Sequence, residues 1–164
     1  MAEYKNIVTD DYLAHAMEKA VHSTLYDTYL IEPKVGDCRL ENDIAPDNSY
    51  IYSIVKMKQG EHCRNILVTG FSQEIPVRIL ANYGFSNVVD KVIIHDCVEE
   101  ITNIIYGKLK ASLNKNGYEF AMEFPEVIED KDVLYQKYNS DKKIISLPFI
   151  INGHLGHVFI AACN

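Results

Sequence analysis

The spacing of apolar positions along the chain predicts three helices. Between about residues 9 and 29, apolar residues recur every three or four positions after cap-type residues, which is typical of an amphipathic helix. A short second helix is expected over 72–83, because Ser72 can cap its first turn and Gly84 can end it. A long third helix is expected from about residue 89 or 96 to 116. The core face of the second helix is expected to comprise Ile75, Ile79, Leu80 and Tyr83.

Runs of β-branched and aromatic residues predict two hairpins. The first joins 50–58 to 63–71, and the second joins 143–151 to 155–163, each across a turn-forming stretch. Apolar and polar residues alternate over 118–124. This alternation predicts one more strand, half-buried and with one face in solvent.

The remaining segments and the order of elements indicate the fold class. Segment 31–49 is expected to be mostly connection with one short strand around 38–40, and 129–141 to be a solvated loop. Helix, strands, helix, long helix and strands in succession predict an α+β (mixed α/β) fold. An antiparallel-rich sheet would then pack against two long helices and one short helix. The 164 residues suit one core, so a single domain over 1–164 is expected.

The charge balance argues against nucleic acid or an anionic membrane as a partner. The chain has 16 Lys and Arg residues against 23 Asp and Glu, a formal net charge of −7, and such a surface repels phosphates on average. The stretch 144–164 lacks charged residues and is long enough to cross a bilayer, but Pro148, Asn152 and Gly153 interrupt it. A hairpin therefore explains this stretch better than a membrane helix does.

The cysteines and histidines give no clear pattern of a disulfide or a metal site. The four cysteines are widely separated and contain no C-x-x-C pair, so reduced thiols are expected, as in a cytoplasmic protein. The N-terminus lacks the basic start and apolar run of a secretory signal, which likewise favours the cytoplasm. His62 beside Cys63, and His154 and His157 near Cys163, are conceivable metal ligands, but no third converging ligand is visible. We therefore expect no metal, and histidines that lie in turns or edge strands.

The third helix separates an apolar stripe from an exposed row. At about 100° per residue, Glu100, Asn103, Gly107 and Lys110 fall nearly opposite the stripe. An exposed Glu and Asn three residues apart are most often ordinary solvated surface. Gly107 adds to the pattern, because a mid-helix glycine costs up to about 1 kcal/mol relative to alanine. On an exposed face, core packing cannot be the reason for this glycine. Its lack of a side chain lets the backbone of another molecule approach the helix closely. The stripe comprises Cys97, Val98, Ile101, Ile104, Ile105 and Leu109, so Cys97 is expected to be a core thiol.

The residues around this row form an ordered motif. Asp96 is followed by three residues, then by Glu100-Ile-x-Asn103, two apolar residues, one further residue and Gly107. The motif resembles the E-x-x-N helix of the CheC/CheX/FliY family of chemotaxis phosphatases, in its CheX form. The flanking segments are similar too: a strand before the 72–83 helix, the Lys-Asn-Gly-Tyr exit of the long helix, and the closing hairpin. The resemblance covers about residues 50–163.

The resemblance implies hydrolysis of the aspartyl phosphate on a CheY-type response regulator. Asn103 would orient the attacking water, and Glu100 would pair with the active-site lysine of the regulator. Asp96, Gly107 and Lys110 would belong to the docking face of the helix. Mg²⁺ would lie on the regulator, so the chain would need no cofactor of its own. Members of this form pair as homodimers through sheet edges, which implies a homodimer here.

The chain departs from the family pattern in three places. The hairpin before Lys58-Gln59-Gly60 lacks the glycine-rich character common in the family. The first helix has no second Glu-x-x-Asn, so at most one site per chain is expected, and segment 31–49 matches nothing in the family. A non-catalytic CheX-like docking or regulatory module is the alternative function. A small-ligand or metal-binding protein is a third class.

Overall fold

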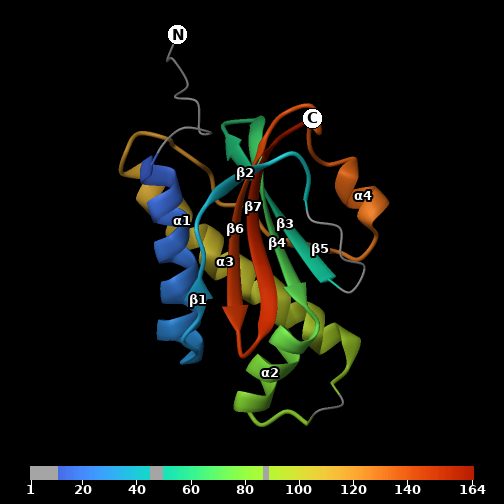
Figure 1. Ribbon diagram of the computed structural model, residues 1–164. Coiled ribbons are helices and arrows are strands. Elements are labelled where there is room, and N and C mark those ends of the chain that lie inside the picture. Colours follow the sequence, from blue (N-terminus) through green and yellow to red (C-terminus); the bar gives the residue numbers. More distant parts are fainter. Residues whose placement is uncertain (1–10, 45–49, 87–88) are drawn as a thin grey trace.

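Seven strands form one antiparallel sheet in the computed structural model, which describes residues 11–44, 50–86 and 89–164 (Figure 1). The order along the sheet is β1, β6, β7, β4, β3 and β5, and β2 also pairs with β6. Every pair of neighbours is antiparallel. The strands are β1 Lys34–Val35, β2 Arg39–Glu41, β3 Tyr50–Gln59, β4 His62–Ser72, β5 Glu126–Ile128, β6 Ile144–Ile151 and β7 His154–Ala162.

Helices lie on both sides of this sheet. The first helix, α1, continues directly into a π-helical turn, η2. The helices α1, α2 and α3 pack on one face, and the short α4 lies against the other. In Figure 1, α3 crosses behind the strands with α1 beside it, and α4 lies on the far side from α1. The helices are α1 Asp11–Ser23, η2 Thr24–Thr28, α2 Glu74–Asn82, α3 Lys91–Asn114 and α4 Lys131–Tyr135.

The central strand β4 is buried on both of its faces. Leu67 and Phe71 point to the helix side, where they join the large core that α1, α2 and α3 complete. Ile66 and Val68 point to the opposite side and join a second, smaller core with Leu134 of α4. Because side chains alternate along a strand, a strand covered on both faces has a continuous apolar run, as β4 does in its middle.

The fold class expected from the sequence is confirmed. Both hairpins form, as β3 with β4 and β6 with β7, and β2 supplies the short strand expected around 38–40. The long helix is α3, which begins at Lys91 and ends at Asn114. Gly117 follows with a φ of 88°, the left-handed conformation that glycine adopts readily after a helix. The cap-type residues expected before the first helix include Thr9 and Asp10, which lie outside the described residues.

The strand expected over 118–124 is wrong. The described residues there form no strand, and Glu119 has a φ of 54°, which interrupts an extended backbone. The Asn114 side chain accepts from the N–H of Phe120 at 2.7 Å and donates to its C=O at 3.0 Å, so both backbone groups of Phe120 bond to the end of α3. The N–H of Ala121 makes a single bond to β3, to the C=O of Lys58 at 2.9 Å. Phe124 is 82% exposed, so the alternation of apolar residues here does not reflect burial in a sheet.

Two further expectations change at the ends of helices. The loop expected over 129–141 contains α4, whose cap residue Asp130 accepts from the N–H of Asp132 at 2.9 Å. Tyr83, expected on the core face of the second helix, is the C-cap of α2 and is 58% exposed. Helical periodicity fails at a cap because the chain leaves the helix there.

Two of the four cysteines are joined, which corrects the expectation of four reduced thiols. Cys63 and Cys163 form a disulfide between β4 and the residue after β7, with Cα atoms 6.1 Å apart. The two strands are neighbours, and the N–H of Cys163 donates to the C=O of Arg64 at 3.1 Å. The two residues are 100 positions apart in sequence, so no local spacing could reveal the pair. Cys38 and Cys97 are free thiols.

His157 lies inside the sheet and not at a turn or an edge. It belongs to β7, between β6 and β4, and its ring stacks on Phe159 with centroids 5.2 Å apart. Burial lowers the pKa of His157 below its ordinary value of 6.5, although the charge of Glu41 acts in the opposite direction. The folded protein therefore keeps His157 neutral at a pH where the unfolded chain protonates it.

We expect the free energy of unfolding to decrease as the pH falls through 6.5, because the unfolded chain then binds a proton that folded His157 excludes. Above this pH, His157 is neutral in both the folded and the unfolded chain, and the full stability is present. His157→Gln should remove it, since glutamine does not titrate. Urea denaturation of both proteins at about pH 7.5 and 5.5 measures the effect. Equal losses of stability in the two proteins would contradict this assignment.

Candidate functional site

The rotation of α3 about its own axis is fixed by an apolar stripe. The helix begins after Asp90, whose carboxylate accepts from the N–H of Val92 at 3.2 Å. Ile104, expected in the stripe, is half-buried at its margin. The other expected members are buried, so the stripe is largely as the sequence predicts. Its buried residues are Cys97, Val98, Ile101, Thr102, Ile105, Tyr106, Leu109 and Leu113.

The opposite side of α3 carries the expected row. Asp96, Glu100, Asn103 and Gly107 are exposed, and Lys110 is half-buried at the end of the row. These positions are spaced four, three, four and three residues apart, so they follow one another along a single helix face. We call these five residues the α3 row. The structure thus places on one face of α3 all five residues that the sequence motif marked as catalytic or docking candidates.

A buried polar pair lies beneath the helix, next to the α3 row in sequence. The hydroxyls of Thr102 and of Thr69 on β4 are 2.7 Å apart. The Thr102 hydroxyl also donates to the C=O of Val98 at 2.7 Å. Both threonines are fully buried, so a displacement of α3 along the sheet would break a hydrogen bond in an apolar layer. This pair helps to fix the position from which Asn103, the next residue, projects.

Glu100 is held by a tyrosine from the first helical segment. The hydroxyl of Tyr29, just after η2, donates to Oε1 of Glu100 at 3.2 Å. Burial of Tyr29, and next the charge of Glu100, raise the pKa of Tyr29 far above its ordinary value, so the phenol stays protonated. Sequence reasoning missed this contact, because the two residues are 71 positions apart and no periodic pattern joins them.

The thiol of Cys97 lies beside the same carboxylate but is not reactive. Burial, followed by the charge of Glu100, raises the pKa of Cys97 to about 12. The thiolate is the nucleophilic form of cysteine, and it is scarce at neutral pH when the pKa is this high. Cys97 is therefore a core residue, in agreement with the sequence prediction.

Asn103 and Gly107 leave the middle of the α3 row open. Within the described part of the chain, the side chain of Asn103 makes no hydrogen bond, so its amide can meet an incoming molecule. A Cβ added to Gly107 would have nothing within 4 Å. Packing inside this chain therefore does not require glycine at 107. The unbonded amide of Asn103 and the lack of a side chain at Gly107 together suit the close approach of a second molecule.

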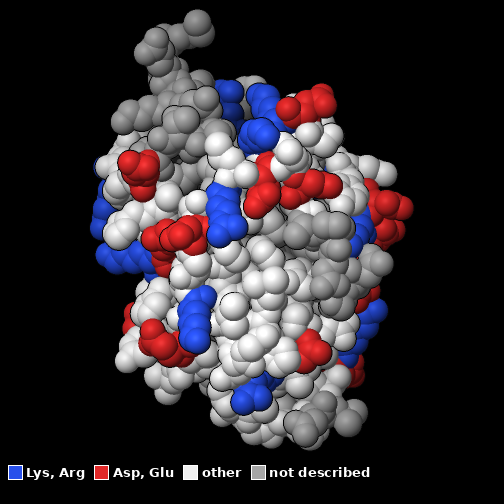
Figure 2. All heavy atoms as spheres, in the orientation of Figure 1, with Lys and Arg blue, Asp and Glu red and all other residues white. Residues whose placement is uncertain are grey.

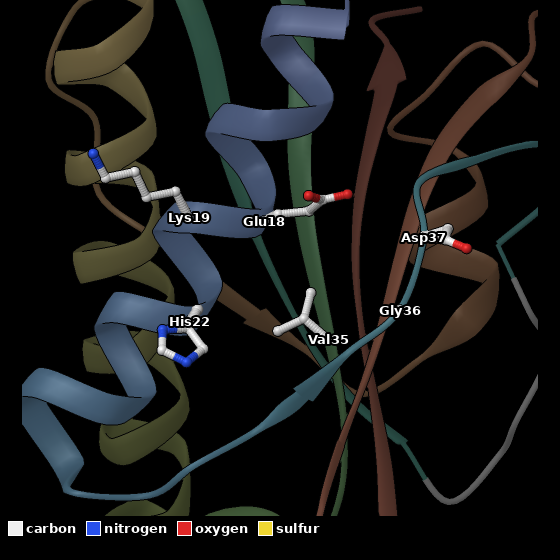
Figure 3. Close-up of a pocket in the computed structure, with 6 residues that line it drawn as sticks. All are labelled: Glu18, Lys19, His22, Val35, Gly36 and Asp37. Atoms are coloured by element: carbon white, nitrogen blue, oxygen red, sulfur yellow. The ribbon is translucent and has the colours of Figure 1, made fainter.

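A hollow of about 420 Å³ lies elsewhere on the molecule, between α1 and the chain around β1 (Figure 3). No residue of α3 lines it, so it is separate from the α3 row. Among the described residues, no group of three His, Cys, Asp or Glu side chains could hold a metal ion. The residues that line the hollow are Glu18, Lys19, His22, Val35, Gly36 and Asp37.

Basic and acidic side chains are mixed on the face shown in Figure 2, with uncharged surface between them. The net charge of −7 therefore does not appear there as one acidic patch. Each described helix is too short or too polar to cross a bilayer.

Solved structures of low sequence identity share the fold. CheX from Vibrio vulnificus has a TM-score of 0.75 and 20% identity, with 92% of this chain and 98% of that chain covered. A CheX–CheY–BeF₃–Mg²⁺ complex from Borrelia burgdorferi gives 0.73 and 20%, covering 94% and 99%. FliY from Thermotoga maritima gives 0.60 and 15%, covering 94% and 92%. A comparison with the curated proteins finds no match.

The sequence itself matches a family model. That model is described as the chemotaxis phosphatase CheX and matches residues 51–150, a range that contains the whole α3 row. The resemblance seen in the motif around Glu100 and Asn103 is thereby confirmed. Since the match spans more than half of the 164 residues, this chain belongs to the CheX family of chemotaxis phosphatases.

Proposed function

We propose that this chain, as one domain over residues 1–164 in the cytoplasm, hydrolyses the aspartyl phosphate of a CheY-type response regulator. One observation carries the proposal: Glu100 and Asn103 project together from an exposed face of α3, within the region that matches the family model. The fold shared with a CheX–CheY–BeF₃–Mg²⁺ complex supports a regulator of this kind as the partner.

The reaction needs a positioned water more than it needs a reactive side chain. Water attacks the phosphorus, the bond between phosphorus and the aspartate oxygen breaks, and the products are inorganic phosphate and the free carboxylate. The exposed Asn103 amide offers a donor and an acceptor without a negative charge. It can therefore orient water beside an anionic phosphoryl group without repelling it.

Glu100 serves as the anchor in this proposal. Its carboxylate would pair with the active-site lysine of the regulator, and a charge-assisted hydrogen bond of this kind fixes orientation as well as affinity. The required Mg²⁺ belongs to the regulator, so this chain supplies no metal ligand. Asp96, Gly107 and Lys110 complete the docking face at the two ends of the α3 row.

The chain also pairs as a homodimer in this proposal, through an edge of the sheet. The edge strand β5 is three residues long, and it follows directly after a segment with two exposed apolar side chains. Met122 is 73% exposed and Phe124 is 82% exposed. Exposed apolar side chains next to a sheet edge are typical of a pairing surface.

Asn103→Ala should lower kcat for regulator dephosphorylation by about 100-fold or more, because the water loses its orienting group. Glu100→Ala should raise KM by about tenfold or more, because a charge-assisted contact is lost. Loss of phosphate from a phosphorylated CheY-type regulator, followed over a range of regulator concentrations, separates the two effects.

Glu99→Ala is the matched control for these variants. It removes a half-buried carboxylate from the same turn of α3 but lies outside the α3 row, so both constants should stay near wild type. A wild-type protein that does not accelerate phosphate loss beyond the rate of the regulator alone would refute the enzymatic function. Binding without acceleration would then indicate a non-catalytic module.

Gly107→Ala should stabilise the protein yet weaken docking. The free energy of unfolding should rise by about 0.5–1 kcal/mol, because alanine favours a helix and its Cβ meets nothing within 4 Å. KM should increase, because the added methyl group projects from the docking face and keeps the regulator from approaching the helix as closely. Urea denaturation and the same kinetic assay measure the two effects. An unchanged KM would show that Gly107 is not part of the docking face.

Phe124→Glu should convert the homodimer to monomer, because a charge would replace an apolar contact beside β5. Analytical ultracentrifugation at several concentrations gives the oligomeric state. Val133→Glu is the control, since Val133 is a partly exposed apolar residue on α4. A wild-type monomer at all concentrations, or a dimer that Phe124→Glu leaves intact, would contradict this pairing surface.

A further inference from the structure

The contact between Tyr29 and Glu100 links a buried side chain to an exposed one. Tyr29 is 6% exposed, whereas Glu100 belongs to the exposed row of α3. The phenol donates to Oε1 of the carboxylate at 3.2 Å. A carboxylate accepts on both of its oxygens, so Oε2 is left for a cation from outside. The arrangement holds one oxygen of Glu100 and presents the other.

The π-helical turn η2 is what places Tyr29 against α3. At about 100° per residue, an unbroken α-helix would point Tyr29 about 160° away from Leu13, which lies in the core. A π turn contains an additional residue, so the residues after it are rotated relative to an α-helix. The turn at Thr24–Thr28 thereby moves Tyr29 onto the buried side, where η2 contacts α3.

A second tyrosine supports the first. The rings of Tyr29 and Tyr83 meet edge to face, with centroids 6.3 Å apart. The Tyr83 hydroxyl donates to the C=O of Thr28 at 3.2 Å, which joins the end of α2 to the end of η2. Tyr29 is therefore held by its buried position and by a ring contact with the residue that ends α2.

We propose that Tyr29 is a positioning residue for the regulator-docking step: it holds the Glu100 side chain in one conformation before the partner arrives. This inference rests on the proposed function. A free glutamate side chain on a helix surface loses rotamer freedom when it enters an interface, and that loss weakens binding. With Tyr29 in place, part of this ordering is complete in the free protein. Asn103 acts on the water independently of it.

Tyr29→Phe is the variant that removes only the hydroxyl. We expect KM for the phosphorylated regulator to rise about three- to tenfold, with kcat within about twofold of wild type. In a Glu100→Ala background the same change should have no further effect on KM, because the group that it positions is absent. Tyr26→Phe is the matched control, since Tyr26 lies on the same π turn and is 50% exposed.

A measurement without the regulator separates this inference from the proposed function. Carbon-13 relaxation of the Glu100 side chain should show greater motion in Tyr29→Phe than in wild type, and Tyr26→Phe should not differ from wild type. An inactive wild-type protein refutes the proposed function. An active wild type, with unchanged Glu100 motion and unchanged KM in Tyr29→Phe, overturns the positioning role. An equal rise in KM in the Glu100→Ala background overturns it as well, because the effect would then be structural.

Discussion

The burial of one stripe of α3 against the sheet is the constraint on which the rest of the molecule depends. Val98, Ile101, Ile105 and Leu109 are each at most 1% exposed. Burying such side chains contributes about 1.5–3 kcal/mol each, whereas a surface contact contributes about 1 kcal/mol or less. The stripe therefore decides the rotation of the helix, and Asn103 is exposed because the opposite side is buried.

Apolar burial alone leaves a helix able to slide along a sheet, and polar contacts remove this freedom. The bond between Thr69 and Thr102 lies between β4 and α3, where an unsatisfied hydroxyl would cost about 1–3 kcal/mol. At the surface, the bond from Tyr29 to Glu100 ties α3 to η2. The long helix is thus fixed in rotation by its stripe and in position by hydrogen bonds to two other elements.

The α3 row could be predicted from the sequence because the helical periodicity that defines it is a local pattern. Helical periodicity over 97–109 is enough to assign Ile101 to the core and Asn103 to the surface, whatever the helix packs against. The same reasoning failed over 118–124, where alternation suggested a strand. There the Asn114 side chain bonds both backbone groups of Phe120, so this residue does not pair with a strand. Period-two patterns over a few residues do not reveal which partner the backbone will find.

The sequence by itself determined both hairpins, the long helix, the fold class and the face of α3 that carries Glu100 and Asn103, because propensity and periodicity act over one or two turns of chain. Only the tertiary structure decided that Tyr29 meets Glu100 and that Cys63 meets Cys163. These pairs are separated by 71 and 100 positions. Such contacts follow from strand order and helix packing, which depend on the free energy of the whole chain and not on any one segment of it.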